Sequence, residues 1–440
     1  MLTFMPISDI IISVVWQRIA AQNRDRFVCR FWRFYMRKKL NFNHTVYACF
    51  IGYVVQAIIV NFAPLLFVTF QNTYGIGLEK ITLLVTINFG IQLIIDLFSS
   101  VFVRRLGYRR TAVIAQCFSI LGFVCLAFLP EICENAYTGL LISTVLYAIG
   151  GGLDEVIISP VVELCPTERK AASMSLLHSF YCWGQLFTIL VSTAFFAIFG
   201  IENWRFLALF WAVIPLADMI LFLLVPMPES EEESGEGLKL GELFRMKKFW
   251  LLALVMVCAG AAELCISQWA SAFAQTGLGV DKTVGDLAGP CLFAALMGTA
   301  RVLYAKFSDR LNAQNAMIAS GVLCIVSYLL AALSPIPALG LVGCALAGFS
   351  VGIFWPCALS IGASSIRGGG VALFAMLALF GDVGCTTGPT LVGIVSDAFG
   401  GRLNVGILFS LVFPVLLIVS VLLYKRDMGI KDKAENNFGK

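Results

Sequence analysis

The loop Arg104-Arg105-Leu106-Gly107-Tyr108-Arg109-Arg110 lies between two long apolar runs, and about 205 positions later Asp309-Arg310-Leu311-Asn312 lies between two more. Shifting the first three apolar runs of the chain by that interval lays them on the seventh, eighth and ninth. Self-similarity at a fixed interval indicates a duplicated unit. The sequence therefore predicts two copies of a unit of six helices.

The composition is typical of a membrane protein. Hydrophobic residues make up 59% of the 440 positions, charged residues make up 13%, and the mean hydropathy is +0.88. A helix needs about 20 apolar residues to cross a bilayer core, and long uninterrupted runs favour helices over the short alternating segments of a barrel. We predict an all-α polytopic membrane protein with twelve transmembrane helices in two six-helix bundles. A net charge of only +4 gives no reason to expect a nucleic-acid partner.

The predicted helices are apolar runs bounded by Gly, Pro or charge. They lie near residues 44–70, 81–103, 111–129, 137–164, 172–199, 206–226, 248–276, 287–307, 316–334, 339–361, 371–399 and 405–424. The segment between the two sets of six carries the charge run Glu229, Glu231, Glu232, Glu233 and Glu236 and is predicted to be a solvated linker. The predicted division is an N-terminal extension 1–43, a bundle 44–226, the linker 227–247, a bundle 248–424 and a tail 425–440.

Lysine and arginine are distributed unevenly along the chain. If the amino terminus lies inside the cell, nearly all of the 31 fall on the inner segments, as the positive-inside rule requires. We therefore predict a cell-membrane protein with both termini cytoplasmic. Two interpretations of residues 1–35 stay open. Arginines mixed with aromatics in residues 24–39 are typical of an interfacial helix, whereas Met36-Arg37-Lys38-Lys39 resembles a natural start of the chain.

Fourteen cysteines and two histidines limit the chemistry of any site. Most cysteines lie inside apolar runs and none forms a C-x-x-C pair, so we expect small buried hydrophobes. Two histidines cannot build a histidine-rich metal site. The loop 277–283 has Asp281 where a phosphate-binding loop needs a glycine before its lysine. We predict no metal, no cofactor, no direct use of ATP and no enzymatic activity.

The paired loops resemble the signature of the major facilitator transporters, which is G-x-L-x-D-R-x-G-R-R between helices 2 and 3 with a weaker copy between helices 8 and 9. Here Arg104 stands where the first copy has its aspartate, and Asn312 stands where the second has its glycine. The further matches are Gly184, Gly388-Pro389, Pro228-Glu229-Ser230 and Glu163 with Arg169. The resemblance covers residues 44–424 and implies parallel six-helix repeats that alternate between inward and outward openings.

Two helices resemble those of the fucose permease group within that superfamily. Glu155 followed by Ser159-Pro160 is similar to the group's Glu-x-x-x-Asn-Pro pattern, and Gly260 to Glu263 followed by Trp269 is similar to its helix 7 pattern. The resemblance implies proton-coupled transport of a neutral sugar or a related polar metabolite. Two alternatives stay open: proton-driven efflux of drugs or metabolites, and a transporter-like sensor that binds without translocating.

Acids at bilayer depth are the candidate binding residues, because burying a charge there is costly. Glu263 lies midway along helix 7 and is the predicted proton carrier, with Gln268 and Trp269 beside it; a helix–helix hydrogen bond is the alternative role. Asp154 and Glu155 point about 100° apart, so one of them is expected to be structural, and the resemblance selects Glu155 as the cavity acid. The other predicted cavity residues, suited to hydrogen-bond and stack on a sugar, are Gln56, Asn61, Asn88, Gln92, Gln185, Tyr181 and Trp183.

Charged residues nearer the inner side are predicted gates. Asp96 and Arg301 occupy equivalent positions in the repeat and can pair across the bundles when the inner side is closed; pairing within one bundle is the alternative. The loop residues predicted to gate are Arg109, Arg110, Asp309 and Arg310. His178 and Asp382 also match in the repeat, and packing is favoured over proton relay for the histidine. The expected partners of a monomeric chain are a small-molecule substrate, protons and the lipid bilayer.

Overall fold

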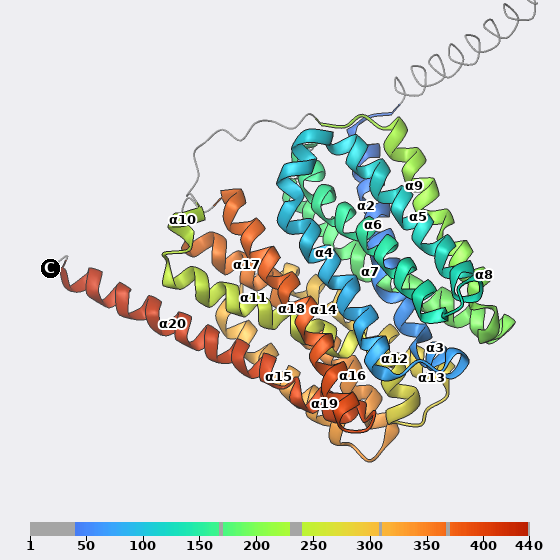
Figure 1. Ribbon diagram of the computed structural model, residues 1–440. Coiled ribbons are helices and arrows are strands. Elements are labelled where there is room, and N and C mark those ends of the chain that lie inside the picture. The colour runs from blue at the N-terminus through green and yellow to red at the C-terminus, as the bar shows by residue number, and fades with distance from the viewer. Residues whose placement is uncertain (1–39, 167–169, 229–239, 308–309, 367–369, 439–440) are drawn as a thin grey trace, which may run out of the picture.

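The structure of the protein is a computed structural model (Figure 1). It describes residues 40–166, 170–228, 240–307, 310–366 and 370–438. Within these ranges the chain is helical apart from turns and short connections. Twelve segments are long and apolar enough to cross a membrane. We number them spans 1–12: Phe42–Tyr74, Leu78–Phe98, Tyr108–Ile132, Ala136–Val162, Leu176–Phe199, Ile201–Leu224, Lys247–Gly277, Lys282–Tyr304, Ala313–Leu333, Pro337–Gly362, Met376–Ala398 and Leu403–Asp427. The predicted all-α fold with twelve transmembrane helices is confirmed.

Spans 1–6 form the amino-terminal half. Their elements are α2 (Phe42–Asn61), η1 (Ala63–Leu66), α3 (Phe67–Tyr74), α4 (Leu78–Leu106), α5 (Tyr108–Ile132), α6 (Ala136–Leu164), α7 (Lys170–Phe199), η2 (Ile201–Asn203), α8 (Trp204–Trp211) and α9 (Val213–Leu224).

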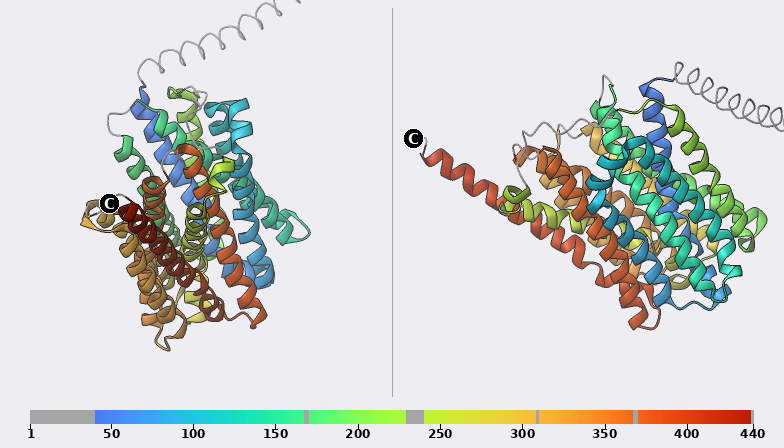
Figure 2. Two further views of the ribbon diagram at one scale, coloured as in Figure 1. Left: turned by 90° about the vertical axis from the view of Figure 1, so that its left-hand side faces the viewer. Right: turned by 45° about the horizontal axis from the view of Figure 1, so that its top comes forward.

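Spans 7–12 form the carboxy-terminal half, and α10 (Leu240–Leu243) precedes them. Their elements are α11 (Lys247–Ser267), α12 (Ala270–Ala272), η3 (Phe273–Gly277), α13 (Lys282–Asp286), η4 (Leu287–Cys291), α14 (Leu292–Phe307), α15 (Ala313–Leu333), α16 (Pro337–Val351), α17 (Phe354–Ser365), α18 (Gly370–Ala398), α19 (Leu403–Phe409) and α20 (Val412–Phe438). The two halves lie side by side in Figure 1 and in the right-hand view of Figure 2, one coloured blue to green and the other yellow to red. We call the end of the molecule where α9 ends and α11 begins the linker side, and the opposite end the far side.

The duplication predicted from the sequence is visible in the packing of two glycines. Gly184 of α7 lies against Ala57 of α2, and about 205 positions later Gly388 of α18 lies against Ala261 of α11. Small residues let membrane helices approach closely, and van der Waals contact then holds them together. Each half therefore uses the same close contact between its first and fifth spans.

Arg109, at the linker-side start of α5, joins span 3 to span 6. Its guanidinium donates hydrogen bonds to the carbonyl oxygens of Phe222 (2.7 Å), Leu223 (3.0 Å) and Val225 (2.7 Å) at the end of α9. The last carbonyls of a helix have no donor within the helix, and they form the negative end of its dipole. These three bonds of the predicted gate residue Arg109 therefore cap a helix inside the amino-terminal half.

Arg109→Gln should lower the stability of the folded protein, because several capping bonds from a charged donor are lost. We expect a loss of about 1.5–3 kcal/mol, the usual contribution of a hydrogen bond to a charged group. The measurement is thermal unfolding of the purified protein in detergent. Arg110→Gln is the matched control, since Arg110 is exposed at the next position. Equal melting temperatures for the two variants would contradict the capping role.

Candidate functional site

Span 7 is interrupted at two of the predicted site residues. Because α11 ends at Ser267 and α12 begins at Ala270, Gln268 and Trp269 lie in a turn. Gln268 Nε2 donates a hydrogen bond to the carbonyl oxygen of Val60 in span 1 (3.2 Å). That oxygen cannot take its usual helical donor, because the residue four positions on is Pro64, which has no N–H. A side chain of one half thus satisfies a backbone group of the other.

Trp269 is completely buried at the seam between the two halves. Its indole Nε1 donates to the carbonyl oxygen of Pro389 in α18 (2.9 Å). Its ring centroid lies 5.4 Å from that of Phe67 in α3, a distance at which aromatic rings attract each other. The ring therefore packs between spans 1, 7 and 11 in this conformation.

Lys282 connects the two halves on the far side. Its ammonium donates to the carbonyl oxygen of Leu65 in span 1 (2.6 Å) and to Asp286 Oδ2 (2.8 Å), and it lies 5.4 Å from the ring centroid of Phe196 in span 5. Asp286 is fully buried and also accepts a hydrogen bond from Ser271 Oγ (2.5 Å). We call Lys282, Asp286, Leu65 and Phe196 the far-side latch. The sequence analysis missed it, because Lys282 and Asp286 look like the ordinary start of a helix.

Two hydrogen bonds between side chains also join the halves. Gln185 Nε2 of α7 donates to Ser267 Oγ of α11 (3.0 Å). Thr86 of α4 and Thr390 of α18 share a hydrogen bond between their hydroxyls (2.7 Å). With Gln268 and the latch, these contacts hold the halves together from the middle of the molecule to its far side.

Gln56 is the centre of a polar group in the amino-terminal half. Its Nε2 donates to Gln92 Oε1 (2.7 Å) and to Glu155 Oε2 (3.0 Å), and Gln92 Nε2 donates to Asn88 Oδ1 (3.1 Å). Gln56 is 4% exposed, whereas Glu155 is partly exposed. Spans 1, 2 and 4 thus bring together four of the predicted cavity residues.

Asp96 and Asp382 meet across the seam. The helices α4 and α18 run antiparallel, and about three turns toward the linker side from the Thr86–Thr390 bond the two carboxyls come within hydrogen-bonding reach. Both carboxylate oxygens of Asp96 are buried, and neither has a donor group as partner among the described residues. A carboxylate can only accept, so two carboxyls hydrogen-bond only when one of them holds a proton.

Glu263 and Arg301 form an ion pair inside the carboxy-terminal half. Arg301 Nη2 lies 3.5 Å from Glu263 Oε2, and Arg301 Nε donates to the carbonyl oxygen of Gly352 (3.2 Å). Glu263 is 7% exposed. Asn61 Nδ2, another predicted cavity group, donates to the carbonyl oxygen of Ala57 (2.9 Å), and Tyr181 lies on α7 near Glu263. Arg301 therefore has its acidic partner within its own half, which is the alternative arrangement, while Asp96 faces the opposite half.

A sequence profile of the Major Facilitator Superfamily matches residues 49–384. The chain belongs to the Major Facilitator Superfamily. Its polar layer, formed by Gln56, Gln92, Glu155, Asp96, Asp382, Glu263 and Arg301, lies at the seam between the two halves of a superfamily fold.

Two solved structures of this superfamily fold are similar to most of the chain. One is a bacterial homolog of the human lysosomal transporter Spinster in an inward-facing and occupied conformation, at 15% identity and a TM-score of 0.67, covering 87% of this chain and 97% of that one. The other is a variant of the E. coli fucose:proton symporter FucP, at 15% identity and a TM-score of 0.58, covering 87% and 99%. A search of curated protein sequences gives no match. Identities this low establish the fold alone.

Two of the predicted cavity residues of this superfamily member lie away from the polar layer. Trp183 is 46% exposed and shares an exposed stripe of α7 with Leu176, Phe187 and Leu190. Its neighbour Cys182 faces span 8, and successive helical residues point about 100° apart, so Trp183 lies on the lipid-facing side. Asp154 points into the amino-terminal half instead, where it contacts Gln116.

Two more of the predicted gate residues lie at the linker side. Arg110 and Arg310 are exposed there, and Asp309 lies outside the described residues. His178 is exposed, and its ring lies 5.6 Å from that of Tyr53, edge to face.

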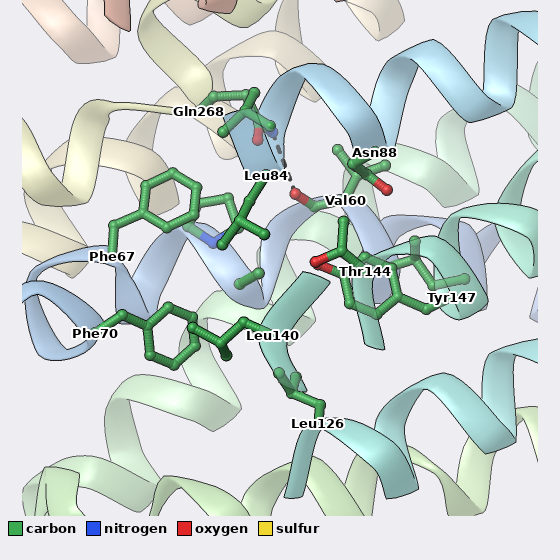
Figure 3. Close-up of a pocket in the computed structure, with 14 residues that line it drawn as sticks. Val60, Phe67, Phe70, Leu84, Asn88, Leu126, Leu140, Thr144, Tyr147 and Gln268 are labelled. Carbon is green, nitrogen blue, oxygen red and sulfur yellow. Dashed lines mark hydrogen bonds between the residues drawn. The ribbon is translucent and has the colours of Figure 1, made fainter. Parts of the chain in front are cut away.

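A small cavity lies in the far-side part of the amino-terminal half (Figure 3). Phe67, Phe70 and Leu84 form much of its wall, and Asn88, Thr144 and Gln268 supply polar atoms. Its volume is about 20 Å³, enough for one water molecule. It is therefore too small to hold a metabolite in this conformation.

Lys282→Met combined with Asp286→Asn should shift the protein toward states open on the far side. The double change removes the cross-seam bond without leaving a buried unpaired charge. We expect a bias of about 1–3 kcal/mol, or about 5–150-fold in population. The measurement is the rate at which a membrane-impermeant maleimide labels a cysteine introduced at Thr82, which is buried against Gly393.

Lys80→Met in the same labelling background is the matched control, since Lys80 is an exposed far-side lysine. Equal labelling rates in the latch variant and in this control would show that the latch does not hold the far side closed.

Proposed function

We propose that the protein is a proton-coupled secondary transporter of a small, neutral, polar metabolite, with a neutral sugar as the first candidate. It lies in the cell membrane with the linker side and both termini in the cytoplasm. Membership of the superfamily supports transport. The Glu155 and Glu263 patterns shared with the fucose permease group support the substrate class and the coupling ion.

The observation that carries this proposal is the polar layer at the seam. It has acids on both halves, with Glu155 and Asp96 on one and Glu263 and Asp382 on the other. Ionised acids are costly at this depth, and the contact between Asp96 and Asp382 needs a shared proton to be a hydrogen bond. When the halves move apart, these acids exchange partners, so proton binding and the opening of the seam affect each other's free energy.

The charge balance of the layer favours a neutral substrate. Among the described residues of the polar layer, the cationic side chain is that of Arg301, and it is already paired with Glu263. A phosphorylated or multiply anionic substrate would need an unpaired Arg or Lys at that depth. Amides such as Gln56, Gln92 and Asn61 suit hydroxyl groups, since each offers both a donor and an acceptor.

The accessible side in this conformation is the linker side. The halves are joined from the middle to the far side by Gln268, Thr86 and the far-side latch. Glu155, Asp382 and Arg301, by contrast, are each partly exposed. The protein therefore adopts an inward-facing arrangement, with the substrate site opening to the cytoplasm.

Glu263→Gln should abolish accumulation driven by a pH gradient and preserve exchange of substrate across the membrane. Glutamine keeps the size and hydrogen-bonding capacity of a protonated glutamate but carries no exchangeable proton. The measurement compares gradient-driven uptake with counterflow in proteoliposomes, using a panel of labelled neutral monosaccharides and, separately, cationic dyes. Glu202→Gln, at an exposed far-side turn, is the control and should match the wild type.

Each other outcome of this experiment has a distinct meaning. Wild-type accumulation in Glu263→Gln would assign Glu263 a structural role with Arg301 and move coupling to Glu155 or to the Asp96–Asp382 pair. Gradient-driven extrusion of dyes without sugar uptake would identify an efflux transporter. Ligand binding without flux would identify a sensor.

A further inference from the structure

Three polar side chains meet inside the amino-terminal half, away from the seam and the polar layer. Gln116 of α5, Asp154 of α6 and Asp218 of α9 are all fully buried, with no exposed surface. Gln116 Nε2 lies 3.0 Å from Asp154 Oδ1, 2.9 Å from Asp154 Oδ2 and 3.0 Å from Asp218 Oδ2. One amide thus connects two acids from different spans.

If both carboxyls were ionised, this group would have too few hydrogen-bond donors for its acceptors. An amide nitrogen carries two hydrogens, but three carboxylate oxygens surround it. The fourth, Asp218 Oδ1, and the amide oxygen Gln116 Oε1 are buried and have no partner among the described residues. Leaving such atoms unpaired costs about 1–3 kcal/mol each. A proton on a carboxyl supplies the missing donor.

Among the described residues, no ion pair neutralises this group. None of the ion pairs formed by the described residues involves Asp154 or Asp218, and no group of three or more metal-ligating side chains occurs among them. From α2, Cys49 faces the two acids and Gly52 lies beside Asp218. Arg109, on α5, donates to backbone carbonyls at the end of α9. Glu155, the next residue on α6, points to Gln56 in the polar layer.

We propose that Gln116, Asp154 and Asp218 form a proton-binding site enclosed within the amino-terminal half, in which at least one carboxyl holds a proton between α6 and α9. Removing that proton puts two like charges in contact at low dielectric, which separates the helices. Because Asp154 and Glu155 are adjacent on α6, occupancy of the enclosed site controls how α6 presents Glu155 to the polar layer. The site makes the packing of this half pH-sensitive whatever the coupling role of Glu263.

The test is infrared spectroscopy of the purified full-length protein at neutral pH, which resolves the carbonyl stretch of a protonated carboxylic acid from the bands of carboxylates. The wild type is isotope-labelled at the aspartate carboxyl carbons, so that the label shifts aspartate bands and leaves glutamate bands in place. We expect a protonated aspartate band that loses intensity in Asp154→Asn/Asp218→Asn. Asp397→Asn, at an exposed far-side position, is the control and should leave the band intact.

The double variant is expected to fold, because asparagine is isosteric with a neutral aspartic acid and can hydrogen-bond Gln116. If it fails to fold, the labelled wild type is compared with labelled Asp96→Asn/Asp382→Asn protein over a pH titration. The proposal requires that a protonated aspartate band remains in that variant. An unchanged band in the folded Asp154→Asn/Asp218→Asn protein would overturn the proposal.

Discussion

The bilayer interior offers no water to hydrogen-bond a polar group, so every buried donor and acceptor must find its partner within the protein. The bond from Gln268 to the Val60 carbonyl follows directly from this constraint. Pro64 removes the donor that the helix would have provided, and a side chain from the other half of the molecule takes its place. The same constraint governs Arg109 at the end of α9 and Lys282 at Leu65. Backbone groups left over where helices end or break become the places where spans are tied together.

The two halves share a backbone plan but not a polar plan. Gly184 with Ala57 and Gly388 with Ala261 show that the close helix contacts are duplicated. The acids differ, since Glu155 is held by Gln56, whereas Glu263 is held by Arg301. Separating a carboxylate from an amide costs little electrostatic energy. Separating it from a cation in a medium of low dielectric costs much more. The two halves therefore respond differently to a proton although both use the same close contact between their first and fifth spans.

The sequence was sufficient to predict the number, order and approximate bounds of the spans, because span length and apolarity are local properties. It also grouped Gln56 with Glu155, and it recognised that Asp154 and Glu155 cannot face the same way. It failed for Trp183 because hydropathy does not distinguish an aromatic that faces lipid from one that faces a cavity; the stripe formed with Leu176 and Phe187 was the available signal. The latch could not be predicted, since one acceptor of Lys282 is a backbone carbonyl in a different half. The contact between Asp218 and Gln116 could not be predicted either, because it depends on how α9 packs against α5 and α6.

The hydrogen bonds of Gln268 and Lys282 across the seam both run from a donor in one half to an acceptor in the other. Both donors are side chains of the carboxy-terminal half, and the acceptors on the amino-terminal half are carbonyl oxygens of Val60 and Leu65. Every amino acid supplies the same carbonyl, so substitutions at residues 60 and 65 can change shape without deleting the acceptor. Sequence change at residues 60 and 65 therefore leaves these two hydrogen bonds in place, and their strength depends on the donor side chains of Gln268 and Lys282. Among related chains, the contribution of these two bonds to closure should then follow what stands at the positions of the donors, while residues 60 and 65 remain free to change.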